Sequence, residues 1–73
     1  MSKTVLITGA TGLIGGHLVK ALQSAGYSYI ALTTNPASAA QKLPGAKKIV
    51  GVNDYMSLKD ENIFAVINLA GAN

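Results

Sequence analysis

Residues 3–26 read KTVLITGATGLIGGHLVKALQSAG and contain three successive patterns. Residues 3–8 form a short apolar run rich in β-branched side chains, which is typical of a strand buried on both faces. A glycine-rich turn follows, and from Leu13 the apolar residues recur at helical spacing until Gly26, which predicts the end of a helix. Thr11 is the expected N-cap of this helix. The apolar positions of the expected helix are Ile14, Leu18, Ala21, Leu22 and Ala25.

The rest of the sequence continues the alternation of strands and helices. Further strands are predicted at residues 28–33, 47–52 and 63–69. Asn35 followed by Pro36 is typical of an N-cap and a first helical position, and the pair predicts a short helix that ends near Leu43. Residues 57–61 allow one or two helical turns. Strands that alternate with helices predict an α/β fold with parallel strands and right-handed crossovers.

The glycine-rich turn, residues 8–15 (TGATGLIG), follows a predicted strand and opens a predicted helix. A dinucleotide-binding fingerprint requires this context. Gly9 would let the chain turn sharply, Gly12 would let the backbone approach a pyrophosphate, and Gly15 would let the helix pack closely on the strand. The alternative is that these glycines only make a tight turn between strand and helix. The context favours a dinucleotide site.

The spacing TGxxGxxG resembles that of extended and atypical short-chain dehydrogenases/reductases. Together with LTxxP at residues 32–36 and VINLAGA at residues 66–72, it most resembles the NAD(P)-dependent epimerase/dehydratase family, in particular nucleoside-diphosphate-sugar epimerases. The resemblance implies a three-layer Rossmann-type sheet with strand order 3-2-1-4, left incomplete in this chain. It also places Asn68 and its neighbours beside the nicotinamide ribose. The cofactor-binding residues that it implies are Gly9, Thr11, Gly12, Leu13, Ile14, Gly15, Thr33, Thr34, Asn35, Leu69, Ala70 and Gly71.

The residues after the second predicted strand bear on the choice between NAD and NADP. NAD-specific folds place an acidic residue about 20 positions past the glycine loop, where it binds the ribose hydroxyls. Residues 32–35 contain no acid, which favours NADP. The resemblance implies an Arg where Thr34 stands, and this chain has no Arg. Thr33, Thr34 and Asn35 are able to donate hydrogen bonds to a phosphate, and a polar turn with a helix cap is the alternative reading.

No catalytic residue can be assigned. The resemblance implies hydride transfer with a Tyr as acid/base, a nearby Lys and a Ser or Thr, all beyond the fourth strand. Residues 1–73 are therefore expected to be the N-terminal portion of an NAD(P)-binding domain, inactive without its catalytic and substrate parts. A stand-alone dinucleotide-binding or redox-sensing module is the alternative. A structural domain whose loop binds nothing is a third possibility.

Composition excludes several other classes. Hydrophobic residues make up 49% of the 73 residues and charged residues 12%, which argues against disorder and for a single domain. No Cys is present, and one His with three acidic residues makes a metal site improbable. The net charge of +3 comes from scattered lysines, so no nucleic-acid partner is expected. No apolar run approaches a membrane span and no signal peptide is recognised, so a cytoplasmic protein is expected. The uncharged strand 63–69 is expected at a sheet edge, where it would pair with another copy.

Overall fold

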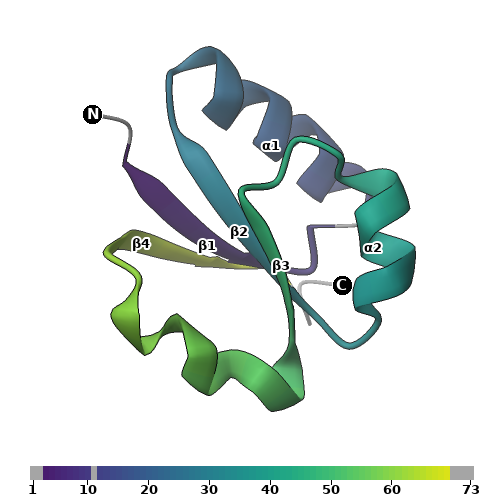
Figure 1. Ribbon diagram of the computed structural model, residues 1–73. Helices are drawn as coiled ribbons and strands as arrows, with labels where there is room; N and C mark the ends of the chain where they lie inside the picture. Colours follow the sequence, from purple (N-terminus) through teal and green to yellow (C-terminus); the bar gives the residue numbers. More distant parts are fainter. Residues whose placement is uncertain (1–2, 11, 70–73) are drawn as a thin grey trace.

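In the computed structural model, which describes residues 3–10 and 12–69, four strands alternate with helices (Figure 1). The strands lie within a residue of their predicted positions. The elements are β1 (Thr4–Thr8), α1 (Leu13–Ser24), β2 (Ser28–Thr33), α2 (Pro36–Lys42), β3 (Lys48–Gly51), the 3-10 helix η1 (Val52–Asp60) and β4 (Ile63–Asn68).

The strands form one sheet in the order β3-β2-β1-β4, and every neighbouring pair is parallel. The predicted strand order is therefore confirmed. At its carboxyl end, β1 pairs on both sides, with Thr8 opposite Leu32 of β2 and Asn68 of β4. Because parallel strands all end at the same edge, the residues that follow them gather there.

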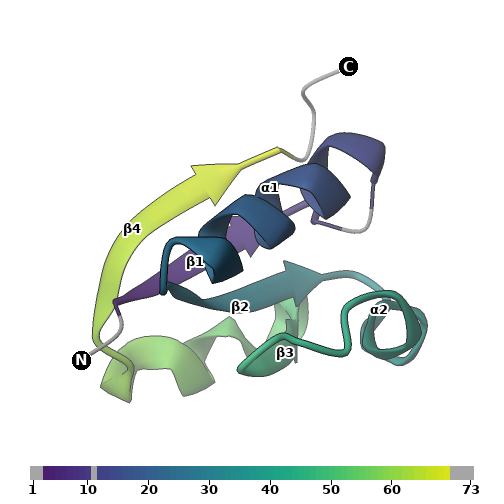
Figure 2. The same ribbon diagram turned by 90° about the horizontal axis from the view of Figure 1, so that it is seen from above.

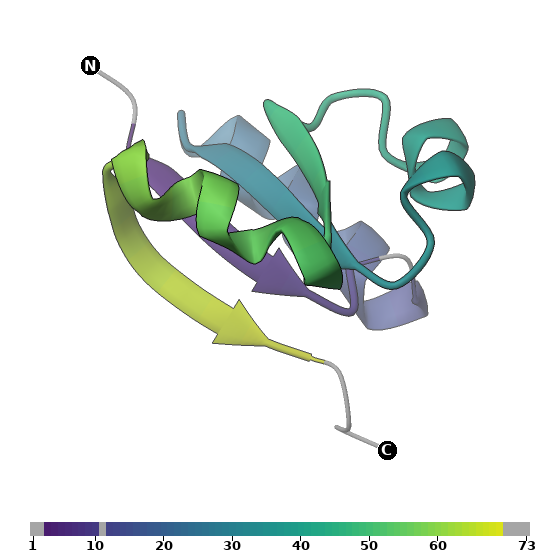
Figure 3. The same cartoon turned by 60° about the horizontal axis from the view of Figure 1, so that its bottom comes forward.

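Helices cover both faces of the sheet, which confirms the three layers. Figures 2 and 3 show α1 and α2 on one face and η1 on the other. The connections from β1 to β2 and from β2 to β3 run in one direction across the sheet, and the connection from β3 to β4 returns. Right-handed crossovers therefore place η1 opposite to α1 and α2. The larger core cluster faces α1 and α2 and includes Val5, Ile7, Val19, Tyr29, Ala31, Ala39 and Leu43. The smaller cluster, Ile30, Val50 and Leu58, faces η1.

The amino end of α1 differs from the prediction. Gly12 is the N-cap, and no side chain within residues 3–10 and 12–69 caps the helix, while the expected cap at Thr11 falls outside the described residues. The predicted apolar face is confirmed only in part, since Leu18 and Leu22 pack against the core, whereas Ala21 and Ala25 are exposed. Ile14 is 65% exposed, and Val19 is buried instead. Gly15, next to Ile14, lies against the loop after β1, so Ile14 faces solvent.

The carboxyl end of α1 matches its prediction. Gly26 has a φ of +89°, a left-handed conformation that favours glycine. Its N–H donates to the Gln23 carbonyl at 3.1 Å, and the Tyr27 N–H donates to the Leu22 carbonyl at 2.9 Å. These two bonds form a Schellman motif, which satisfies carbonyls that the end of the helix would leave unpaired.

The segment between β3 and β4 is more helical than predicted. Instead of one or two turns at residues 57–61, η1 spans Val52–Asp60, with non-helical dihedral angles at Asp54. Leu58 is the buried side chain that holds η1 on the sheet. Among residues 52–59 only Leu58 is buried, so the segment has no apolar periodicity from which a longer helix could be predicted.

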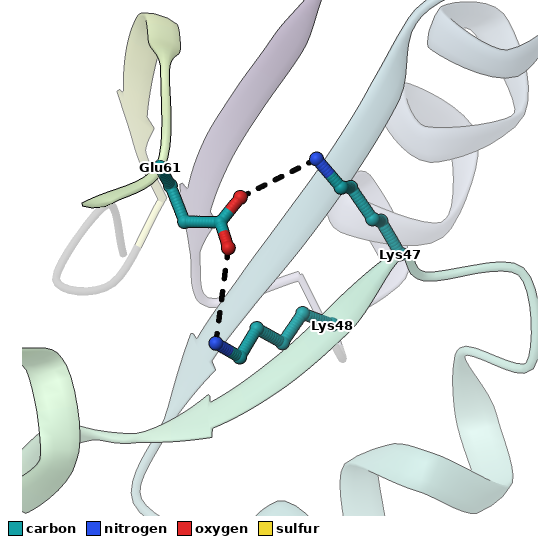
Figure 4. Close-up of polar contacts among 3 residues, drawn as sticks. All are labelled: Lys47, Lys48 and Glu61. Atoms are coloured by element: carbon teal, nitrogen blue, oxygen red, sulfur yellow. Dashed lines mark hydrogen bonds and ion pairs between the residues drawn. The ribbon is translucent and has the colours of Figure 1, made fainter. Parts of the chain in front are cut away.

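A charged cluster joins the two segments that enter β3 and β4. Glu61 lies between two lysines, with its carboxylate 3.3 Å from the Lys47 ammonium and 3.8 Å from the Lys48 ammonium (Figure 4). The lysine side chains are half exposed, so water screens both pairs and each adds at most about 1 kcal/mol to stability.

Candidate functional site

A cleft of about 370 Å³ lies at the carboxyl edge of the sheet. Its wall comes from the ends of β1, β2 and β4 and from the first residue of η1. Open α/β sheets bind ligands at this edge, where the connections leave a central strand in opposite directions. Among the described residues, the lining consists of Thr8, Gly9, Leu32, Thr33, Thr34, Val52 and Asn68.

The glycine loop forms the part of the cleft that follows β1. Gly9 has a φ of +76°, so the chain turns off the strand through a conformation that favours glycine. The predicted role of Gly9 in the sharp turn is confirmed. The Gly12 N–H donates to the Gly9 carbonyl at 3.4 Å and closes the turn just before α1 begins.

Contacts within the chain explain why position 15 is a glycine, but they do not explain the glycine at position 12. A Cβ added at Gly15 would overlap the backbone of Ala10, so the fold itself requires a glycine there. The close contact is with the loop after β1 and not with the strand, which corrects the predicted packing. A Cβ added at Gly12 would meet nothing nearer than the Gly9 carbonyl oxygen, at 3.8 Å. Contacts within the chain therefore do not explain the glycine at position 12.

The predicted residues at the end of β2 divide into two groups. Thr33 and Thr34 line the cleft, and Thr34 is exposed. Asn35 does not line it. The Asn35 side chain accepts a hydrogen bond from the Ser38 N–H at 3.2 Å, and Pro36 occupies the first position of α2. The predicted helix cap is therefore confirmed. The Asn35 N–H also donates to the Thr33 hydroxyl oxygen at 3.2 Å, which orients that hydroxyl.

The end of β4 contributes Asn68 to the cleft. Leu69 follows it, and its N–H donates to the Thr8 carbonyl at 2.9 Å. The Leu69 side chain packs against the core cluster on the α1 face, not into the cleft. Among the remaining predicted site residues, Ile14 points away from the core into solvent and Gly15 is buried. The predictions for Thr11, Ala70 and Gly71 fall outside the described residues, and the Leu13 side chain does as well.

Three lining residues were missed by the sequence analysis: Thr8, Leu32 and Val52. The missed signal was their position, because each lies at or beside the carboxyl end of a strand. The described part of the chain contains no group of three or more acidic or His side chains placed to hold a metal ion. Its helices are also too short or too polar to cross a membrane.

The parallel sheet, the glycine turn after its first strand and the cleft at its carboxyl edge define a Rossmann-type α/β domain. The chain belongs to the NAD-dependent epimerase/dehydratase family, whose family model matches residues 5–73. It is 42% identical to UDP-glucose 4-epimerase 2 of Arabidopsis thaliana, over 97% of this chain and 25% of that protein. It is 44% identical to UDP-glucose 4-epimerase of Neisseria gonorrhoeae, over 68% of this chain and 15% of that protein.

The chain thus spans about a quarter or less of the length of these relatives. Comparison with solved structures gave no significant match.

Proposed function

We propose that the chain binds an NAD(P) dinucleotide across the carboxyl ends of β2, β1 and β4, as the N-terminal part of a sugar-nucleotide epimerase or dehydratase. Membership of an NAD-dependent family and the similarity to two UDP-glucose 4-epimerases support this proposal. The cleft supports it independently, because it extends across three strand ends, as an extended two-nucleotide ligand requires.

The observation that carries the proposal is the space at Gly12. Gly12 is exposed, it caps α1, and among the described residues an added Cβ would meet only the Gly9 carbonyl oxygen, at 3.8 Å. The amino end of α1 also carries no acidic residue in its first turn. Free backbone N–H groups and the positive end of the helix dipole favour a phosphate at such a place, and the missing Cβ lets the phosphate approach the backbone.

The proposal assigns the predicted site residues to three parts of the dinucleotide. The pyrophosphate would lie at the glycine loop, the adenine-side ribose at the end of β2, and the other ribose at the end of β4. The residues proposed for these three places are Gly9, Thr11, Gly12, Leu13, Ile14 and Gly15; then Thr33, Thr34 and Asn35; then Leu69, Ala70 and Gly71.

NADP is the cofactor that we propose over NAD. The residues that follow Leu32 are polar and uncharged, so no carboxylate at the end of β2 repels a 2′-phosphate. Thr34 presents an exposed hydroxyl beside the cleft. The Asn35 side chain caps α2, so Asn35 would contribute through its backbone N–H, which donates to the Thr33 hydroxyl oxygen and holds it in place.

Gly12→Ala tests the proposal, with Gly16→Ala as its matched control. Neither added Cβ would clash with the chain, so both variants should fold. Gly12→Ala should weaken NADPH binding by about tenfold or more because its methyl group occupies the phosphate position. Gly16→Ala should keep the wild-type affinity. NADPH and NADH are titrated against each protein by ligand fluorescence, and the wild type should bind NADPH more tightly.

Two results would contradict the proposal. If the wild type shows no saturable binding, the whole proposal is wrong. If Gly12→Ala and the wild type bind NADPH with equal affinity, the phosphate does not lie at the glycine loop. The epimerase or dehydratase chemistry is tested separately by reading the coding sequence past Asn73. A continuing frame with Tyr-x-x-x-Lys beyond a further strand supports the enzyme, and an immediate stop codon favours a stand-alone binding module.

A further inference from the structure

The end of β1 and the end of β4 are joined by a side-chain hydrogen bond inside the cleft. Thr8 and Asn68 are register partners, and both line the cleft. The Thr8 hydroxyl donates to the Asn68 side-chain oxygen Oδ1 across 2.5 Å. This bond connects two residues that are 60 positions apart in the sequence.

This bond sets which way the Asn68 amide faces. The Thr8 hydroxyl donates to the amide oxygen Oδ1, so the oxygen and not the amide nitrogen lies toward β1. The Thr8 hydroxyl has one proton, and this bond uses it.

The Asn68 amide nitrogen is thereby turned away from β1. It carries two N–H donors, and within residues 3–10 and 12–69 neither has a hydrogen-bond partner. The Asn68 side chain is exposed at the cleft. It lies on the opposite side of the glycine loop from Thr33 and Thr34, because β4 and β2 flank β1.

We propose that Thr8 is a positioning residue, which holds the Asn68 amide so that its two N–H donors face an oxygen acceptor of the bound dinucleotide. This inference rests on the proposed function, since it names a contact in the same cleft. The acceptor is either a pyrophosphate oxygen or a ribose hydroxyl oxygen, and both accept a hydrogen bond in the same way. Without the Thr8 hydroxyl, the amide is free to rotate, and its two N–H donors are no longer held toward the ligand.

Four variants separate positioning from simple structural support. Thr8→Val keeps the shape of the side chain and removes the donor, and Thr8→Ser keeps the donor. Asn68→Asp keeps an oxygen to accept from Thr8 but removes both N–H donors. Asn68→Ala removes the amide altogether, and it is also combined with Thr8→Val in a double variant.

The expected results concern NADPH affinity at a temperature where every variant is folded by circular dichroism. Thr8→Val should lose about 3- to 10-fold in affinity, the range of one neutral hydrogen bond, and Thr8→Ser should stay within about twofold of wild type. Asn68→Asp should lose about tenfold or more if the acceptor is a pyrophosphate oxygen, because a carboxylate then replaces the donors beside a negative charge. In the Asn68→Ala background, Thr8→Val should have no further effect on affinity, because the group that it positions is gone.

Shorter ligands identify the acceptor. If Asn68→Ala weakens ADP, ADP-ribose and NADPH alike, the acceptor is the pyrophosphate. If it weakens ADP-ribose and NADPH but not ADP, the acceptor is the second ribose. Either result supports the proposal.

Two outcomes overturn the positioning role while leaving dinucleotide binding intact. One is a Thr8→Val variant with a lower melting temperature but unchanged affinity, which would make the bond a structural link only. The other is an equal loss from Thr8→Val with and without the Asn68 side chain. A wild-type protein that binds no dinucleotide would instead contradict the proposed function itself, and the positioning role with it.

Discussion

Three glycines within five positions of the loop and first helix turn are present for three different reasons. Gly15 is required by the fold, because any side chain there would overlap the Ala10 backbone. Gly12 is not required by the fold, and its missing Cβ leaves space at the phosphate position that we propose. Gly16 has open space around its missing Cβ and lies in the interior of α1, where Ala would favour the helix by about 0.5–1 kcal/mol. The glycine spacing alone does not separate these roles.

Tyr29 gives the protein a measurable pH dependence at the scale of one residue. Burial raises the pKa of the Tyr29 hydroxyl above its ordinary value of 10.0. In the unfolded chain this hydroxyl ionises first, so above pH 10 the unfolded state binds fewer protons than the folded state. The stabilising contribution is therefore complete below pH 10.0 and is lost as pH rises toward the raised pKa.

The comparison of wild type with Tyr29→Phe isolates this effect. Urea unfolding between pH 8 and 11 should show the free energy of unfolding of the wild type falling more steeply above pH 10 than that of the variant. The additional slope should be at most about 1.4 kcal/mol per pH unit. The two proteins differ only in this hydroxyl, so all other contributions cancel in the difference. Parallel curves throughout this range would refute the assignment.

At the scale of elements, the end of α1 depends on the backbone conformation of one residue. Gly26→Ala should destabilise the protein by about 1–2 kcal/mol, the cost of a left-handed conformation with a Cβ. The added methyl group would lie in open space, so no clash contributes to the loss. Thermal unfolding measures the change. Gly16→Ala is the control, since it adds the same methyl group in open space where the φ angle is helical, and it should not destabilise the protein. A wild-type melting temperature for Gly26→Ala would show that the helix end relaxes freely.

At the scale of the whole molecule, the sheet has an uncovered edge. Within the described part of the chain, β4 pairs only with β1, and its sequence IFAVIN carries no charge. Val66 is 62% exposed on this strand and Phe64 is 55% exposed. Natural edge strands are commonly blunted by charge, proline or a covering element, because their unpaired N–H and C=O groups pair readily with another strand. We therefore predict that this chain self-associates through β4.

Val66→Lys tests this prediction, with Tyr55→Lys as the matched control. Both side chains are exposed, so either lysine remains in solvent, but Tyr55 lies on η1, away from the edge. Light scattering over a range of concentrations should show larger species for the wild type and for Tyr55→Lys than for Val66→Lys. A wild-type monomer at all concentrations would contradict the prediction. If only Tyr55→Lys lost the association, the contact between copies would be made by η1 and not by the edge strand β4.

The order and type of most elements were predictable from the sequence, because local patterns carry that information. Apolar β-branched runs marked the four strands, Gly26 marked the end of α1, and Asn35 with Pro36 marked the start of α2. Right-handed crossovers between these elements then predicted the strand order β3-β2-β1-β4, which the structure has. The family was also recognisable, since the glycine loop and the VINLAGA segment are both short, contiguous motifs.

What only the tertiary structure decided are the features made by residues far apart in the chain. The close contact between Gly15 and the Ala10 backbone turns Gly15 toward the loop after β1 and leaves Ile14 exposed. Leu58 held all of η1 on the sheet although its neighbours show no periodicity. The hydrogen bond from Thr8 to Asn68 and the cleft that both line arise because parallel pairing brings the ends of β1 and β4 together. Local sequence specifies local backbone conformation, whereas such contacts exist only once the sheet has formed.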